Sequence, residues 1–117
     1  MYLLDQKQAS IRVYLGNVDF RKSIDGLSQL VADETPESVF SGTVFVFVSR
    51  DRTRIKCLKW DLNGFVLWMK RLEKRRYGFK PVRESGLREL SESDFLLWLS
   101  GVDIFSRFEA LSFTCVR

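Results

Sequence analysis

The chain has 117 residues, of which 45% are apolar and 29% are charged, and its formal net charge is +4. This composition is typical of a globular domain with an adequate core and excludes a disordered chain. The apolar runs are too short to span a bilayer, and the absence of histidine excludes His-based acid–base catalysis, His-activated nucleophiles and the usual zinc sites.

The ends and the cysteines are typical of a cytoplasmic protein. Met1–Asp5 lacks the basic start and apolar segment of a signal peptide, so we expect the protein in the cytoplasm. Cys57 and Cys115 are far apart and form no CxxC pair, which predicts two reduced core residues. The glycines form no phosphate-loop motif. We therefore expect one domain over residues 1–117, with no cofactor.

The first predicted elements are a strand over residues 9–15, where apolar residues alternate, and a helix over Phe20–Val31, where they recur every three or four positions. Asp19 is well placed to cap this helix. Arg21 and Lys22 would then lie in its first turn, where the helix dipole disfavours cations. Two alternatives stay open: an anion bound at this point, or two exposed solubilising cations.

The central part of the sequence predicts three strands. Residues 43–49 form an apolar, β-branched and aromatic run that is typical of a buried central strand. A charged loop over residues 50–54 follows, and then a hairpin of strands 54–60 and 65–71. The Asn63-Gly64 pair would supply the positive backbone φ angles of the hairpin turn.

Pairing of Trp60 with Phe65 would divide the hairpin into two faces. We expect one face to pack on the helix: Leu58, Trp60, Phe65, Leu67 and Met69. We expect the other to be partly exposed: Ile55, Cys57, Lys59, Val66, Trp68 and Lys70. A slip of one residue in register would exchange the two faces.

The C-terminal part predicts a second, shorter helix. Residues 81–86 are linker-like, and Ser91–Asp94 resembles a capping box that opens a helix ended by Gly101. Residues 111–116 alternate and predict a last strand. The expected fold is α+β: an antiparallel sheet of about five strands, with the main helix packed on one face and the C-terminal helix beside it.

Positive charge is concentrated between Arg50 and Arg83. This stretch holds 12 basic and 3 acidic residues, whereas the remainder holds 7 basic and 12 acidic residues. Aromatic residues lie between the cations, a composition that can follow a phosphate backbone and stack on bases. The alternative is a solvated sheet face whose aromatic residues belong to the core. Trp68 is the better stacking candidate, because Lys59 and Lys70 share its expected face.

Carboxylates are candidate metal ligands, since nucleases hold Mg²⁺ with clustered acidic groups. The candidates are Asp19, Asp25, Asp61, Asp94 and Asp103. Asp19, Asp61 and Asp94 each have a structural role as a cap or turn residue. A metal-dependent nuclease would therefore require that two or three of Asp19, Asp25, Asp61 and Asp103 converge around a cleft.

Five segments, in order, resemble one family of proteins. Residues 18–27 resemble its TDMRKGFDGL motif, 40–47 its FSGxxFVF, 51–61 its GDRIKILWWD, 64–73 its GxxLWYKRLE and 98–103 its LLEGID. The family is the small accessory protein, called TnpB or the second open reading frame, of the IS-sixty-six group of bacterial insertion sequences. The resemblance covers about residues 11–103. Ser23 replaces the usual glycine, Lys59 replaces the first tryptophan of a pair, and residues 104–117 extend past the usual end.

The resemblance implies a role in moving the element, beside a separate transposase that carries the acidic catalytic triad. We expect this accessory role to be non-enzymatic. We expect the accessory protein to bind DNA without sequence preference. The expected phosphate contacts are Arg52, Arg54, Lys59, Lys70, Arg71, Lys74, Arg75 and Arg76, with Trp68 packing or stacking nearby and Arg21 and Lys22 extending the footprint. The alternative is an adaptor that docks on the transposase through the same basic patch.

Overall fold

The fold is described by a computed structural model for residues 10–78 and 86–103. The described chain forms a five-stranded sheet in the order β4-β3-β2-β1-β5, with two helices. The elements are β1 (Ile11–Tyr14), α1 (Ile24–Glu34), β2 (Val44–Val48), β3 (Arg54–Asp61), β4 (Gly64–Arg71), β5 (Leu87–Leu90) and α2 (Glu92–Leu99). The expected α+β class and number of strands are confirmed.

The sheet is mixed rather than wholly antiparallel. β1 and β2 are parallel, whereas the β1–β5, β2–β3 and β3–β4 pairs are antiparallel. The parallel pair arises because α1 forms a crossover between β1 and β2, and such a connection returns the chain in the same direction. The edge strand β5 was not predicted, since its short Leu-Arg-Glu-Leu sequence carries little signal. The last strand that was predicted, at 111–116, lies outside the described residues.

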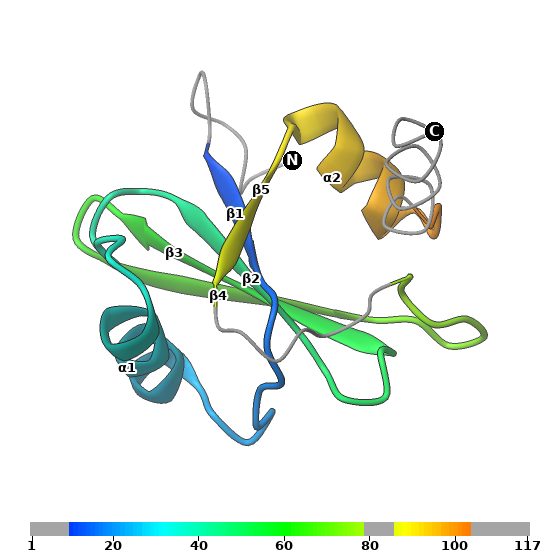
Figure 1. Cartoon of the computed structure of the whole chain (residues 1–117), viewed down its shortest axis with the longest axis horizontal. Helices are drawn as coiled ribbons and strands as arrows, with labels where there is room; N and C mark the ends of the chain where they lie inside the picture. The colour runs from blue at the N-terminus through cyan, green and yellow to red at the C-terminus, as the bar shows by residue number, and fades with distance from the viewer. Residues whose placement is uncertain (1–9, 79–85, 104–117) are drawn as a thin grey trace, which may run out of the picture.

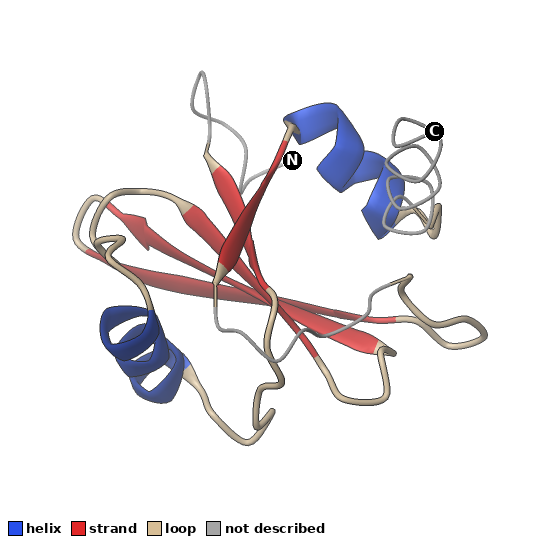
Figure 2. Cartoon of the chain, viewed as in Figure 1, coloured by secondary structure: helices blue, strands red, loops and turns tan. Residues whose placement is uncertain are grey.

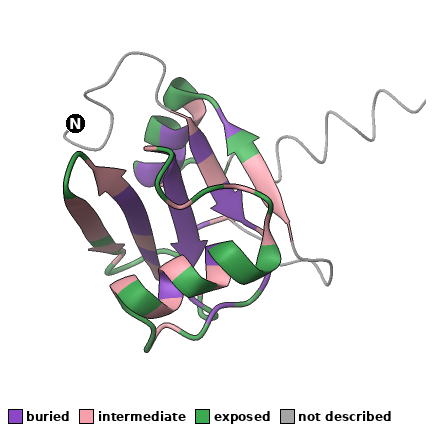
Figure 3. Cartoon of the chain, turned by 90° about the vertical axis from the view of Figure 1, so that its left-hand side faces the viewer, coloured by how far each residue is buried: buried purple, intermediate pink, exposed green. Residues whose placement is uncertain are grey.

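The two helices lie on opposite sides of the sheet (Figure 2). β2 is buried along its whole length, and its alternating side chains divide the core into two clusters. Phe45 and Phe47 pack with Leu27 and Val31 of α1. The valines of β2 pack on the other face with α2, in a cluster that includes Trp98. Figure 3 shows this burial in the central strands.

Helix α1 begins at Ile24, one turn later than the predicted Phe20. Asp19 does not cap the helix, because its carboxylate accepts a hydrogen bond from the backbone N–H of Arg21 (3.0 Å) and its carbonyl accepts one from that of Lys22 (3.0 Å). These bonds make a separate turn before the N-cap residue Ser23. Arg21 and Lys22 therefore precede the helix, and the expected conflict with its dipole does not arise.

Helix α2 follows its prediction closely. The side chain of Ser91 accepts a hydrogen bond from the backbone N–H of Asp94 (3.1 Å), which confirms the expected N-terminal cap. Gly101 has a φ of +105°, a conformation that favours glycine and ends the helix. Within the described ranges, neither helix is long and apolar enough to cross a membrane.

The hairpin register is the predicted one, with Trp60 opposite Phe65. Leu58, Phe65 and Leu67 pack on the α1 side, as expected. The other face was expected to be partly exposed, and it is so only in β4: Ile55, Cys57 and Lys59 are buried, whereas Val66, Trp68 and Lys70 are half-buried. Residues of α2 lie in the core cluster on this side, and Val66 and Trp68 pack against that cluster. Cys57 is fully buried there, and burial raises the pKa of its thiol, consistent with a reduced core residue. Cys115 lies outside the described residues.

The hairpin turn differs from its prediction in one residue. Asp61 pairs with Gly64, so the two loop residues are Leu62 and Asn63. The positive φ, +53°, belongs to Leu62 rather than to the Asn63-Gly64 pair. A leucine in this left-handed region is strained, and its side chain is 88% exposed, so packing does not compensate for the strain.

Candidate nucleic-acid interface

Three segments meet at the end of the sheet away from the hairpin turn (Figure 1). They are residues 17–22 before α1, 49–54 between β2 and β3, and 71–78 at and after the end of β4. Their cations form what we call the basic end: Arg21, Lys22, Arg50, Arg52, Arg54, Arg71, Lys74, Arg75 and Arg76.

Hydrogen bonds hold the three segments together. The backbone N–H of Leu72 donates to the carbonyl of Thr53 (2.7 Å), and that of Tyr77 donates to the carbonyl of Arg52 (2.6 Å). The ammonium of Lys56 donates to the carbonyls of Phe20 (2.8 Å) and Lys22 (2.7 Å). Lys56 therefore holds the segment before α1 against β3, and its ammonium group is directed at backbone oxygens.

The loop between β2 and β3 is organised around Asp51. Its Oδ1 accepts hydrogen bonds from the hydroxyl of Ser49 (2.7 Å), the hydroxyl of Thr53 (2.8 Å) and the backbone N–H of Thr53 (3.1 Å). These bonds favour the ionised carboxylate and lower its pKa to about 2. Arg52, at the tip, has a φ of +63°, which is uncommon for a residue with a side chain. The loop thus has a fixed shape.

The segment before α1 contains an internal ion pair. The guanidinium of Arg21 donates to both oxygens of Asp19, through Nε to Oδ1 (3.0 Å) and through Nη2 to Oδ2 (2.8 Å). This pairing holds the pKa of the Asp19 carboxyl well below its usual range. The side chain of Arg21 is nevertheless 91% exposed. Arg21 brings an accessible but already paired guanidinium to the basic end.

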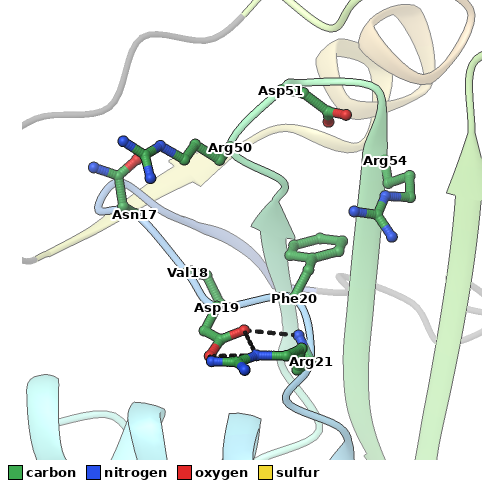
Figure 4. Close-up of a pocket in the computed structure, with 8 residues that line it drawn as sticks. All are labelled: Asn17, Val18, Asp19, Phe20, Arg21, Arg50, Asp51 and Arg54. Carbon is green, nitrogen blue, oxygen red and sulfur yellow. Dashed lines mark hydrogen bonds and ion pairs between the residues drawn. The ribbon is translucent and has the colours of Figure 1, made fainter.

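The segment before α1 and the loop between β2 and β3 line a cavity of about 840 Å³ that is open to solvent (Figure 4). The lining residues are Asn17, Val18, Asp19, Phe20, Arg21, Arg50, Asp51 and Arg54. The guanidinium carbon of Arg54 lies 5.3 Å from the centre of the Phe20 ring, and the ammonium of Lys56 lies 4.9 Å from it. Figure 4 shows Arg54 beside Phe20, whereas Arg50 extends on the other side toward Asn17.

Two of the predicted phosphate contacts do not face solvent as expected. Lys59 is only 4% exposed. The ammonium of Lys70 donates to the carbonyl of Leu99 (2.9 Å), at the C-terminal end of α2, where a cation stabilises both the free carbonyls and the helix dipole. Trp68 is partly buried against the α2-side core. All three belong to the face that α2 covers, and sequence periodicity could not reveal that cover.

The segment after β4 keeps its predicted cations at the surface. Lys74, Arg75 and Arg76 are exposed, and Arg71 forms an exposed ion pair with Glu73 (3.0 Å). The segment is anchored one residue later, at the fully buried ring of Tyr77.

Arg50 was not among the predicted contacts, although it lines the cavity. Its place in a highly charged loop was the only sequence signal for it.

The described residues contain no group of three or more Cys, Asp or Glu side chains that could hold a metal ion. No three of the carboxylates named above therefore converge on one site within the part of the chain that the structure describes. Asp19 and Asp51 do line the same cavity, and each is already hydrogen-bonded to its own loop.

Comparison with known proteins identifies the family. Residues 9–108 match the family model described as IS66 Orf2-like protein, where IS66 is the IS-sixty-six group named above. The chain belongs to this family. It is 35% identical over 86 residues to the uncharacterized protein y4jC of Sinorhizobium fredii, covering 74% of this chain and 73% of that one. It is 29% identical over 96 residues to y4hO of the same organism, covering 80% and 83%. No solved structure matches the chain with significance.

The IS66 Orf2-like family supports an accessory role in an insertion sequence. Two of the family-like segments, 18–27 and 51–61, are separated by more than twenty residues in the sequence but contribute to the same cavity. The fold thus brings two of the segments that resemble the family, 18–27 and 51–61, together at the basic end.

Proposed function

We propose that the protein is a non-catalytic accessory subunit of transposition that binds DNA through the basic end. The observation that carries this proposal is the gathering of cations, exposed except for the half-buried Arg54, that lack an acidic partner in the described part of the chain. Arg50, Arg54, Lys74, Arg75 and Arg76 form no ion pair with any described residue. Such a surface is stabilised by a polyanion, and the phosphate backbone is the polyanion that this family's setting supplies.

The register of the hairpin adds to this argument. Arg54 lies directly opposite Arg71 on the same face of the β3–β4 pair. Like charges at directly opposed positions of two strands destabilise a sheet by about 0.2–1 kcal/mol. An arrangement with such a cost in the free protein is consistent with a surface whose charge is neutralised by a bound anion.

Lys59 and Lys70 are left out of the proposed contact set for the reasons given above. The proposed contacts are the residues of the basic end, which include Arg50 in addition to the contacts predicted from the sequence. Because these side chains reach phosphates rather than base edges, binding should show little sequence preference.

The test is fluorescence anisotropy with short duplex and single-stranded DNA across a series of salt concentrations. The variant Lys74→Gln/Arg75→Gln should bind more weakly, and the slope of log K against log salt should flatten by about 0.9 for each duplex phosphate contact that is lost. A matched control, Gln29→Glu/Ala32→Glu on exposed positions of α1, changes the net charge by the same amount away from the basic end. It should keep the wild-type slope. Equal weakening by both variants, or no binding by the folded wild type at low salt, would contradict the proposal.

The second candidate is an adaptor that presents the same basic end to an acidic surface of the element's transposase. Salt dependence does not separate the two, because both predict charge-dependent binding. Partner identity does separate them. An adaptor would bind purified transposase in the absence of nucleic acid and would lose that binding in Lys74→Gln/Arg75→Gln, whereas direct DNA binding needs no second protein.

A further inference from the structure

We propose that the cavity between residues 17–21 and 50–54 is a discrete site for one phosphate group of a nucleic-acid strand, held between Arg50 and Arg54. This inference deepens the proposed function and rests on it for the identity of the ligand. It differs from a diffuse basic surface because it assigns one phosphate to a defined recess and gives it particular partners.

The charges of the cavity are not balanced by its own acidic residues. Asp19 is occupied by Arg21, and Asp51 is occupied by the hydroxyls of Ser49 and Thr53. Neither carboxylate makes an ion pair with Arg50 or Arg54 in the described part of the chain. Arg50 and Arg54 therefore line the cavity from opposite sides with no ion pair to either carboxylate, although Arg54 lies over the Phe20 ring and is attracted by the charge of Asp51.

The walls of the cavity are fixed by bonds that leave these two arginines free. Lys56 ties the Phe20 and Lys22 carbonyls to β3, and Asp51 ties its own loop together. The ring of Phe20 lies beside Arg54 and limits where its guanidinium can go. A site with a fixed shape loses less conformational freedom on binding than a set of mobile surface side chains does.

Phosphate is the anion that fits these donors. Guanidinium presents its N–H groups in a planar fork that matches two phosphate oxygens, and it stays charged at all physiological pH values. The phosphate can be a backbone diester or the terminal monoester of a strand. Both present the same oxygens, and the terminal group carries the greater negative charge.

The first experiment uses inorganic phosphate as the probe, with amide NMR spectra recorded at constant ionic strength against chloride. We expect saturable shifts confined to residues 17–21 and 50–54. Arg50→Gln/Arg54→Gln should weaken phosphate binding by about tenfold or more, since two charge-assisted interactions are lost. Lys74→Gln/Arg75→Gln removes the same charge outside the cavity and should leave the shifts in place. Shifts that are absent, unsaturable or equally reduced in both variants would overturn the proposal.

The second experiment compares oligonucleotides that differ only in a terminal phosphate. If the cavity takes the strand end, the phosphorylated oligonucleotide should bind more tightly, and Arg50→Gln/Arg54→Gln should abolish the difference. If it takes a backbone diester, the two should bind equally, and the same variant should weaken both while reducing the salt slope by about 0.9, the value for one duplex phosphate. A reduction of about 1.8 would mean two separate phosphates and would overturn the single-site proposal.

The two experiments separate failure of the site from failure of the function. DNA binding that depends on Lys74 and Arg75 but not on Arg50 and Arg54 would refute the phosphate site and leave the proposed function standing. Saturable binding of inorganic phosphate without binding of DNA would refute the proposed function and support the cavity as an anion site.

Discussion

The two ends of the β3–β4 hairpin have the same alternating backbone pattern and opposite chemistry. At the turn end, Phe40, Trp60 and Phe65 pack against one another, with ring centres 5.1 Å apart for Phe40–Trp60, 5.0 Å for Trp60–Phe65 and 5.7 Å for Phe40–Phe65. At the other end, Arg54 faces Arg71, and the nearby loops add further cations. We call the first group, with Leu62, the aromatic end.

Under the proposed function, this contrast would separate residues that stabilise the fold from residues that bind DNA along one pair of strands. The aromatic rings at the turn pack on one another, and both contacts of Trp60 are edge-to-face, although Phe40 remains 61% exposed. The cations at the other end are placed by bonds of neighbouring residues, such as Lys56 and Asp51, and Arg50, Arg54, Lys74, Arg75 and Arg76 form no ion pair with a described residue. We therefore expect mutations at the aromatic end to change the free energy of unfolding, and mutations at the basic end to change binding.

The largest expected effect comes from a residue that connects α2 to the basic end. Trp98 is fully buried, lies 5.1 Å from the ring centre of Tyr77 and donates a hydrogen bond from Nε1 to the carbonyl of Gly78 (3.1 Å). Trp98→Ala should lower the free energy of unfolding by about 3–5 kcal/mol, measured by denaturant unfolding. It should also weaken DNA binding by the variant that is still folded, because the segment carrying Lys74–Arg76 loses its anchor.

Leu96 provides the control for this change, since it lies on the same helix and is 43% exposed. Leu96→Ala should change the free energy of unfolding much less. If Trp98→Ala destabilised the protein without any effect on binding by the folded fraction, the segment after β4 would not depend on this anchor.

The next largest effect is a loss of stability at the aromatic end. Trp60→Ala removes two edge-to-face contacts from a partly buried position and should cost about 2 kcal/mol of stability. DNA affinity and its salt slope should stay at wild-type values, measured well below the unfolding midpoint. Met69→Ala, at a 54% exposed position of β4, is the control and should change stability by about 0.5 kcal/mol or less. A lower DNA affinity of the folded Trp60→Ala protein would contradict the expectation that the aromatic end affects stability and not binding.

A smaller effect, in the stabilising direction, is expected at the hairpin turn. Leu62 has a φ of +53° and an exposed side chain, so Leu62→Gly should relieve backbone strain and lose little burial. We expect a gain of up to about 1 kcal/mol in thermal or denaturant unfolding, since the greater freedom of glycine in the unfolded chain offsets part of the relief. Asn63→Gly, one residue later and without a positive φ, should not stabilise. Destabilisation by Leu62→Gly would show that the leucine contributes packing that outweighs its strain.

The smallest effect is the acid sensitivity of the loop at the basic end. The folded state lowers the pKa of Asp51 from 3.8 to about 2, mainly through the hydroxyls of Ser49 and Thr53. A lowered carboxylate pKa stabilises the folded state above the ordinary value, and this contribution disappears as the pH falls through the window from about 4 to 2. Asp51→Asn should therefore unfold with a shallower pH dependence in that window, read from thermal melts.

Ser49→Ala, which removes the leading donor to Asp51, should give an intermediate pH dependence. Identical curves for the wild type and Asp51→Asn would mean that the loop does not couple to folding at acid pH.

Local sequence patterns predicted those features that depend on neighbours in the chain. The alternation in residues 54–71 gave the register of Trp60 with Phe65, and Ser91 capped α2 as its spacing indicates. The start of α1 was misplaced because the Asp19 carboxylate has two possible uses, a helix cap and a turn with Arg21, and the sequence does not say which bond is formed.

The candidate site was predicted only in part, because cations were identified but their surroundings were not. Lys59 and Lys70 lie in the same charged hairpin as Arg54 and Arg71, yet they belong to the face that α2 covers. Arg50 was not predicted as a phosphate contact, although it lines the cavity with Arg54.

By itself, the sequence determined the family, the α+β class, the hairpin and the excess of positive charge in its central stretch, because motif order, periodicity and charge are local properties of a chain. Only the tertiary structure decided which cations remain exposed and which two loops form a cavity. These outcomes depend on contacts between segments far apart in sequence: α2 covers one face of the hairpin, and Lys56 draws residues 20–22 onto β3.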